Sequence, residues 1–135
     1  MSAGGQALPV EDRLDIHELA ARYGTVVDDR DWEHLDEVFT VDATFELQGF
    51  GRVDGRYDGL DAIRALMTAG PHPVAHHVTN VLVDSHDGLV TMRSKIVGTT
   101  PRGGAGSADY ADVLRLEPVG WRIARRTVTL RRAMP

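Results

Sequence analysis

The sequence predicts an α+β domain in which three N-terminal helices wrap a cone-shaped, curved antiparallel sheet. Apolar residues recur at helical spacing before Pro73, and four long strand-like segments joined by turn residues follow it. Helices that precede such a meander pack on one face of its sheet, so the two halves of the chain form two layers. A concave sheet of this kind can hold a small apolar ligand between itself and the helices.

The helices are expected where apolar residues repeat every three to four positions. The first follows residues 1–8, which are rich in Gly, Ser and Ala and are expected to form a flexible leader. Asp31 is placed to cap the second helix, and the glycine and proline at 70–71 end the third. The apolar stripes consist of Ile16, Leu19, Ala20, Tyr23, Val26 and Val27, then Trp32, Leu35, Val38 and Phe39, then Leu60, Ile63, Leu66 and Met67.

The strands are expected where apolar and polar residues alternate between turn signals. One strand is predicted at 43–47, and the glycine-rich stretch 49–59 predicts a turn or hairpin after it. The four strands of the meander are expected at 74–84, 89–99, 108–116 and 121–130. With no internal repeat or composition boundary, residues 9–132 are expected to form a single domain.

Composition excludes several classes of protein. The chain has 135 residues and no cysteine, which excludes disulfides, zinc–thiolate sites, iron–sulfur clusters and thiol nucleophiles. No apolar run approaches the roughly 20 residues of a membrane span, and the N-terminus lacks the basic start and apolar stretch of a secretory signal. We therefore expect a cytoplasmic protein without a membrane partner.

Charge is unevenly distributed along the chain. Residues 120–135 carry five arginines and no acid, whereas the rest of the chain holds all 20 acids. The arginines interrupt a strand-like pattern, so we expect them to find acidic partners in the same molecule or in a neighbouring subunit. Because the net charge of −5 repels phosphate, no nucleic-acid partner is expected.

Two adjacent histidines, His76 and His77, begin the first strand of the meander. Neighbouring residues of a strand point to opposite faces, so one of the two should face the concave side unless a bulge intervenes. A histidine there can serve as a proton shuttle near neutral pH, or simply bond to a backbone group. Asn80, on the same strand, either holds a polar group of a ligand or bonds at the strand edge.

Tyr23 lies on the apolar stripe of the first helix, and Asp28 follows five residues later. Five helical steps place the two side chains about 140° apart, so they converge only if the helix ends near Val27. Otherwise Tyr23 is a core residue with its hydroxyl at the pocket edge, and Asp28 is a capping or solvated acid.

No metal or other cofactor is expected. His72 and His76 have helical spacing, but Pro71 and Pro73 forbid a regular helix there, and ligands from one extended strand diverge. The chain also lacks a nucleotide-binding glycine motif and a lysine-containing phosphate loop.

The order of elements and three local motifs resemble the SnoaL-like branch of the nuclear transport factor 2-like superfamily, whose fold is a cystatin-like roll. The resemblance covers about residues 9–132. Its motifs are IHELAARY at 16–23 followed by DDRDW at 28–32, YDGLDAI at 57–63, and HHVTN at 76–80.

Within that family the motifs are most similar to scytalone dehydratase and the bile acid 7α-dehydratases. This resemblance implies catalytic roles for Tyr23, Asp28 and His77 around an apolar cone. The segment 92–97 lacks the further histidine or aspartate that those dehydratases place on the next strand. The remaining candidates for substrate binding are Asn80, His76, Val27, Trp32, Phe45 and Met67.

The leading functional hypothesis is a cofactor-independent lyase or isomerase, similar to a dehydratase or a polyketide cyclase. It would act by His–Asp acid/base chemistry on a small hydrophobic polycyclic or aromatic compound. The alternatives are a non-catalytic small-molecule binding protein of the same fold and a small structural subunit of a ring-hydroxylating oxygenase. Family members commonly pair through the open sheet face, so a homodimer is expected.

Overall fold

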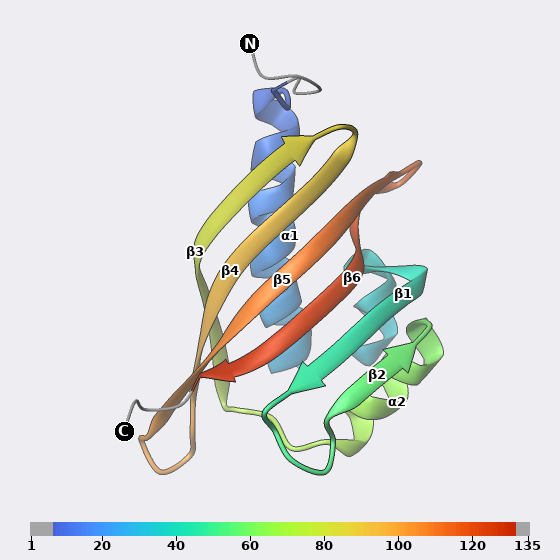
Figure 1. Ribbon diagram of the computed structural model, residues 1–135. Coiled ribbons are helices and arrows are strands. Elements are labelled where there is room, and N and C mark those ends of the chain that lie inside the picture. The colour runs from blue at the N-terminus through green and yellow to red at the C-terminus, as the bar shows by residue number, and fades with distance from the viewer. Residues whose placement is uncertain (1–6, 132–135) are drawn as a thin grey trace.

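The computed structural model describes residues 7–131, so most of the leader expected at 1–8 lies outside the described residues. Two α-helices, one 3₁₀-helix and six strands follow one another in these residues (Figure 1). Their order is α1 (Val10–Asp28), η1 (Trp32–Glu37), β1 (Phe39–Gln48), β2 (Gly55–Asp58), α2 (Leu60–Ala69), β3 (Ala75–His86), β4 (Leu89–Thr99), β5 (Ala105–Glu117) and β6 (Gly120–Arg131).

The six strands form one sheet in the order β2-β1-β6-β5-β4-β3. The four-stranded meander is antiparallel throughout, and the glycine-rich stretch after β1 forms the predicted hairpin with β2. β1, however, lies parallel to β6, so the sheet is mixed rather than purely antiparallel. A parallel pair cannot be joined by a tight turn, and here α2 and the other strands lie between its two members in sequence. The predicted α+β class and the N-terminal position of the helices are confirmed.

Helix α1 crosses one face of the sheet and packs mainly against β3, while α2 lies beside β1 and β2 (Figure 1). The opposite face carries no helix among residues 7–131. Strand alternation sends every second side chain toward α1, as in β4, where positions 90, 92, 94, 96 and 98 are buried. The core therefore forms between the inner face of the sheet and the helices.

The sheet curls around this core because several strands contain irregular pairing. The register shifts between Thr79 and Leu82 on β3, and Asn80 there has a φ of +55°. Such a bulge inserts an extra residue, bends the strand and changes which side chains face inward. This change decides which histidine of β3 reaches the concave side.

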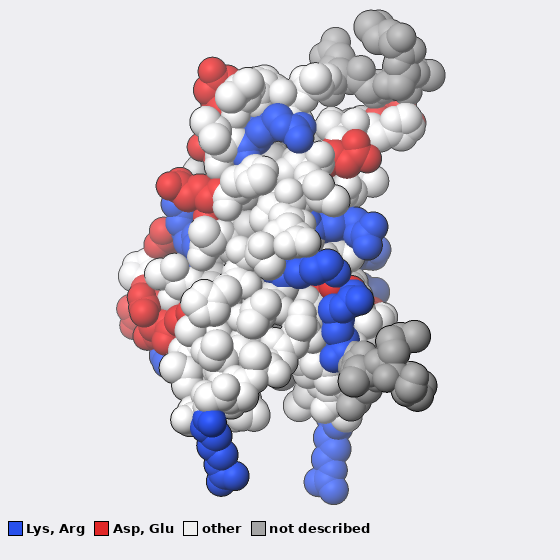
Figure 2. All heavy atoms as spheres, turned by 90° about the vertical axis from the view of Figure 1, so that its left-hand side faces the viewer, with Lys and Arg blue, Asp and Glu red and all other residues white. Residues whose placement is uncertain are grey.

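Acidic and basic side chains are unevenly spread over the surface. In the view of Figure 2, acidic side chains lie mostly along one border, whereas basic ones lie mainly over the other half and at the lower end. Two of the C-terminal arginines pair with acids of β5: Arg126 with Asp112, and Arg131 with Asp109. These two ion pairs confirm that some of the C-terminal arginines have acidic partners within the same chain. Among the described residues, no helix is long and apolar enough to cross a membrane.

Candidate functional site

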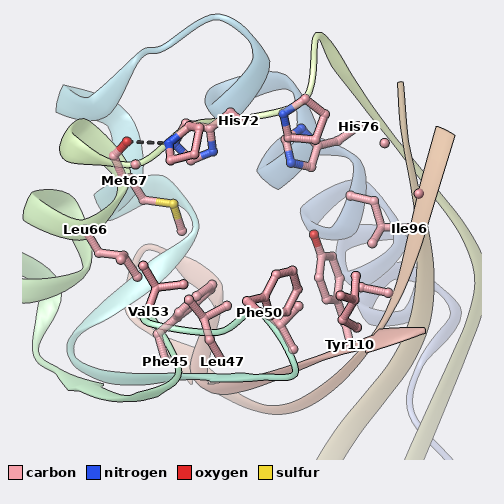
Figure 3. A pocket seen from close by; sticks show the side chains of 18 of the residues that line it. Phe45, Leu47, Phe50, Val53, Leu66, Met67, His72, His76, Ile96 and Tyr110 are labelled. Carbon is pink, nitrogen blue, oxygen red and sulfur yellow. Dashed lines mark hydrogen bonds between the residues drawn. The ribbon is translucent and has the colours of Figure 1, made fainter. Parts of the chain in front are cut away.

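A pocket of about 600 Å³ lies between the curled sheet, helix α2 and the loop that joins α2 to β3. Most of its wall is apolar, and among residues 7–131 the only charged lining residue is Arg52 on the β1–β2 hairpin. Figure 3 shows His72 and His76 side by side at one end of the pocket, across from Phe45, Leu47 and Phe50. A cavity of this size fits a compact ring system.

His76 is held by Asp28 at this end of the pocket. The carboxylate of Asp28 accepts hydrogen bonds from the Nδ1 atom of His76, at 2.6 Å, and from its backbone N–H, at 2.9 and 3.0 Å. Asp28 is the last residue of α1, where β3 passes alongside the helix. A carboxylate on Nδ1 fixes the ring tautomer and leaves Nε2 as the nitrogen that can accept a proton from a ligand.

The structure pairs Asp28 with His76 and not with His77, which corrects the position inferred from the resemblance. His77 is exposed, pairs with Val97 on β4, and does not line the pocket. Alternation counted back from Val81 and Val83, both partly buried against the core, selects position 77 as inward. The bulge at Asn80 shifts this alternation by one residue, so His76 and Val78 face inward instead.

Tyr23 and Asp28 both reach His76, although they lie on different sides of α1. Asp28 binds the ring edge, and the ring of Tyr23 packs against the imidazole with centroids 6.3 Å apart at 90°. The two side chains therefore converge on a third residue rather than on each other. Tyr23 is buried, and this burial raises the pKa of its hydroxyl, so the group is a protonated donor at neutral pH.

Tyr110 on β5 joins Tyr23 at the pocket, with ring centroids 5.6 Å apart. Burial raises the pKa of Tyr110 well above its ordinary value, and the neighbouring Tyr23 raises it further. The pocket wall thus contains two neutral phenols, of which that of Tyr23 packs against the imidazole of His76. Tyr110 was not among the residues predicted from sequence.

Behind the two tyrosines lies a buried ion pair that sequence reasoning also missed. Arg126 on β6 donates two hydrogen bonds to Asp112 on β5, at 2.7 and 2.8 Å, and neither side chain is exposed. The guanidinium lies 4.3 Å from the ring centroid of Tyr23 and 4.0 Å from that of Tyr110. Burial raises the pKa of Asp112, while Arg126 opposes that rise. The sequence did contain an indication of this buried acid. Asp112 occupies the same alternating positions of β5 as the apolar residues before and after it, and such positions face the core.

The remaining predicted residues divide into two groups. Phe45 and Met67 line the pocket as expected. Val27 is buried in the core, Trp32 packs against His72, and Asn80 is exposed at the bulge, so none of these three lines the pocket. Over residues 7–131, no cluster of three or more His, Asp or Glu side chains is arranged to hold a metal ion.

Comparison with known proteins places these residues in a family. The model of the SnoaL-like domain matches residues 9–127. The uncharacterized protein Rv2910c of Mycobacterium tuberculosis is 32% identical over 128 residues, covering 89% of this chain and 86% of that protein.

Solved structures give the same result. A putative aromatic ring hydroxylase from Novosphingobium aromaticivorans is 31% identical with a TM-score of 0.75, covering 96% of this chain and 94% of that one. An NTF2-like protein with a cystatin-like fold from the same organism is 27% identical with a TM-score of 0.76, covering 93% and 85%.

Proposed function

This chain belongs to the SnoaL-like family of the nuclear transport factor 2-like superfamily, and we propose that it is a cofactor-independent lyase or isomerase. Its substrate would be a small hydrophobic polycyclic or aromatic compound that carries a carbonyl group. The observation that carries this proposal is the Asp28–His76 contact at the end of an apolar pocket, beside a buried tyrosine.

The geometry supports proton abstraction next to a carbonyl. Nε2 of His76 takes the proton from the carbon beside the carbonyl, and the carboxylate of Asp28 stabilises the imidazolium that forms. The hydroxyl of Tyr23 donates to the carbonyl oxygen, where negative charge develops. An isomerase returns the proton to another carbon, whereas a dehydratase returns it to a leaving hydroxyl.

Neutral tyrosines suit this role because only a protonated phenol can donate. Burial keeps the pKa of Tyr23 above its ordinary value, even though the positive charge of Arg126 lowers it. The hydroxyl therefore stays protonated across the neutral range, and the proton-transfer step needs no group from outside the chain.

Proton exchange tests the proposal without knowledge of the final product. Aromatic ketols and hydroxy-steroids are incubated with the protein in D₂O, and NMR follows deuterium entering beside the carbonyl and loss of water. In Asp28→Asn and His76→Gln, the rate on any active compound should fall by about 10²- to 10⁴-fold, the usual contribution of a positioned base. His77→Gln, at the exposed neighbouring position, should keep the wild-type rate.

Two results would contradict the proposal. One is an active compound whose exchange rate is unchanged in both Asp28→Asn and His76→Gln. The other is tight binding of these compounds without exchange or turnover, which would favour a binding protein. Strand β4 gives some support to the binding-protein alternative. Its inward residues at the pocket, Ile96 and Gly98, provide no further acid or base.

The uncovered outer face of the sheet supports a second copy of the chain as partner. Val97 and Leu82 are exposed on it, and Val113 is half-buried. The alternative of a small subunit that packs on an oxygenase would use the same face. Sedimentation of the purified chain distinguishes the two, because a homodimer forms without any second protein.

A further inference from the structure

His72 occupies the same end of the pocket as His76 and has no role in the reaction described above. It lies on the loop between α2 and β3, flanked by Pro71 and Pro73. The two imidazole centroids are 6.4 Å apart, and Figure 3 shows both rings at the pocket wall. A ligand group held beside His76 therefore lies within reach of His72 as well.

The orientation of the His72 ring is determined by its contacts. Its Nε2 atom donates to the backbone carbonyl of Met67, at 2.6 Å, in the last turn of α2. Its ring packs at 5.4 Å from Trp32, and prolines on both sides restrict the backbone. Because Nε2 carries the hydrogen, Nδ1 is the nitrogen with a free lone pair.

We propose that Nδ1 of His72 accepts a hydrogen bond from a hydroxyl group of the ligand, so that the pocket selects hydroxylated ring compounds. This inference rests on the proposed function and extends it by naming a substrate class. The tyrosine hydroxyls suit a carbonyl oxygen, whereas the His72 acceptor suits an O–H donor. A hydroxy ketone satisfies both.

The protonation state of His72 agrees with an acceptor role. Burial lowers the pKa of the His72 imidazole, and the nearby Arg30 and His76 lower it further. The carbonyl of Met67 and the carboxylate of Asp28 act in the opposite direction. At neutral pH the ring is uncharged. When the pH falls through its pKa, the proton adds at Nδ1 and the acceptor is lost.

In a dehydration, this contact positions the leaving group. His76 takes the proton from carbon, and the same proton moves to the hydroxyl oxygen as the carbon–oxygen bond breaks. Water leaves and a carbon–carbon double bond forms, so no other reactant is consumed. The hydrogen bond to His72 directs the hydroxyl hydrogen away from His76 and leaves an oxygen lone pair facing it.

Binding of two matched probes tests this assignment. 2-Naphthol carries a hydroxyl donor, and 2-fluoronaphthalene has nearly the same size without one. At pH 7.5 the wild-type protein should bind 2-naphthol about tenfold more tightly, which corresponds to one retained hydrogen bond. NMR titration gives both dissociation constants, and the preference should weaken as the pH falls through the pKa of His72, which a histidine NMR titration of the same protein locates.

Three variants test whether His72 is the source of the preference for 2-naphthol. His72→Phe removes Nδ1 and keeps a ring against Trp32, so both probes should bind alike. His72→Gln keeps an amide donor for the Met67 carbonyl and an oxygen acceptor for the pocket, and should restore at least part of the preference. His77→Gln should behave as wild type, because His77 lies outside the pocket.

Several outcomes overturn the proposal: equal binding of the two probes by the wild type, a preference that survives in His72→Phe, or binding of neither probe. A ¹⁵N spectrum showing the hydrogen of His72 on Nδ1 would also overturn it, whatever the probes do. These readouts do not depend on turnover. A normal probe preference together with an exchange rate that is unchanged in Asp28→Asn and His76→Gln would therefore count against the proposed reaction alone.

Discussion

Two pairs of ionisable side chains lie near the pocket end of the sheet, and they differ in whether a ligand in the pocket can reach them. Asp112 and Arg126 face each other across β5 and β6, and neither side chain is exposed. Asp28 and His76 join α1 to β3, with 22% and 8% of their side chains exposed. The first pair lies behind the tyrosines, whereas His76 of the second pair lines the pocket.

This difference separates a structural role from a chemical one. In the buried pair, two parallel hydrogen bonds hold the guanidinium, and burial makes either charge costly without the other. In the pocket pair, the carboxylate occupies one nitrogen of the imidazole and leaves the second for a ligand. The buried pair also acts on the pocket, because its guanidinium packs on the rings of Tyr23 and Tyr110.

The largest expected effect comes from breaking the buried pair. Arg126→Met leaves the Asp112 carboxylate without its partner and should lower the free energy of unfolding by about 3–5 kcal/mol. Asp28→Asn keeps an oxygen that accepts from the backbone N–H of His76, so it should cost only about 1 kcal/mol. Urea unfolding of both variants measures the difference.

A double variant provides the control for this comparison. Arg126→Met with Asp112→Leu replaces both charges by apolar side chains and should recover most of the lost stability. If Arg126→Met alone costs no more than Asp28→Asn, the buried pair does not have the structural role assigned to it.

A smaller effect is expected at the loop that carries His72. A Cβ atom added at Gly98 would lie 2.7 Å from Cγ of Pro73, so Gly98→Ala must displace the proline. We expect a loss of about 1–3 kcal/mol in unfolding free energy, as for other overpacked sites, together with shifted NMR signals of His72. Urea unfolding and a histidine NMR spectrum measure the two effects.

Gly106 is the matched control, because it pairs with Gly98 across β4 and β5, and a Cβ there meets no atom within 4 Å. Gly106→Ala should keep wild-type stability or increase it slightly. Equal behaviour of the two alanine variants would show that contact with Pro73 does not constrain the loop.

The sequence predicted the α+β architecture, but not the parallel pairing of β1 with β6. Periodicity located the helices and the meander, and the family motifs identified Tyr23 and Asp28, which the structure brings together around one histidine. Strand alternation left open which of His76 and His77 faces inward, and the resemblance placed His77 beside Asp28. The structure gives that contact to His76, because a single-residue bulge at Asn80 shifts the alternation, and local sequence does not reveal that bulge. Arg126 was assigned to a basic end of the chain, because its partner on β5 becomes visible only when the strands are paired.

The smallest expected effect concerns another contact between an imidazole and a carboxylate, on the surface at His34 and Asp31. Nδ1 of His34 lies 2.7 Å from the Asp31 carboxylate, nearly as close as the 2.6 Å of the pocket pair, but the side chain of His34 is 53% exposed. The hydrogen bond that His34 donates to the Asp31 carboxylate raises the pKa of His34. Protonated His34 therefore adds some stability below pH about 6.5, and that contribution is lost as the pH rises through the raised pKa.

In Asp31→Asn, NMR titration should show the pKa of His34 moving back toward its ordinary value, while the exchange rate on any active compound stays the same. A fall in that rate similar to the fall in Asp28→Asn would mean that position in the pocket does not distinguish the two pairs.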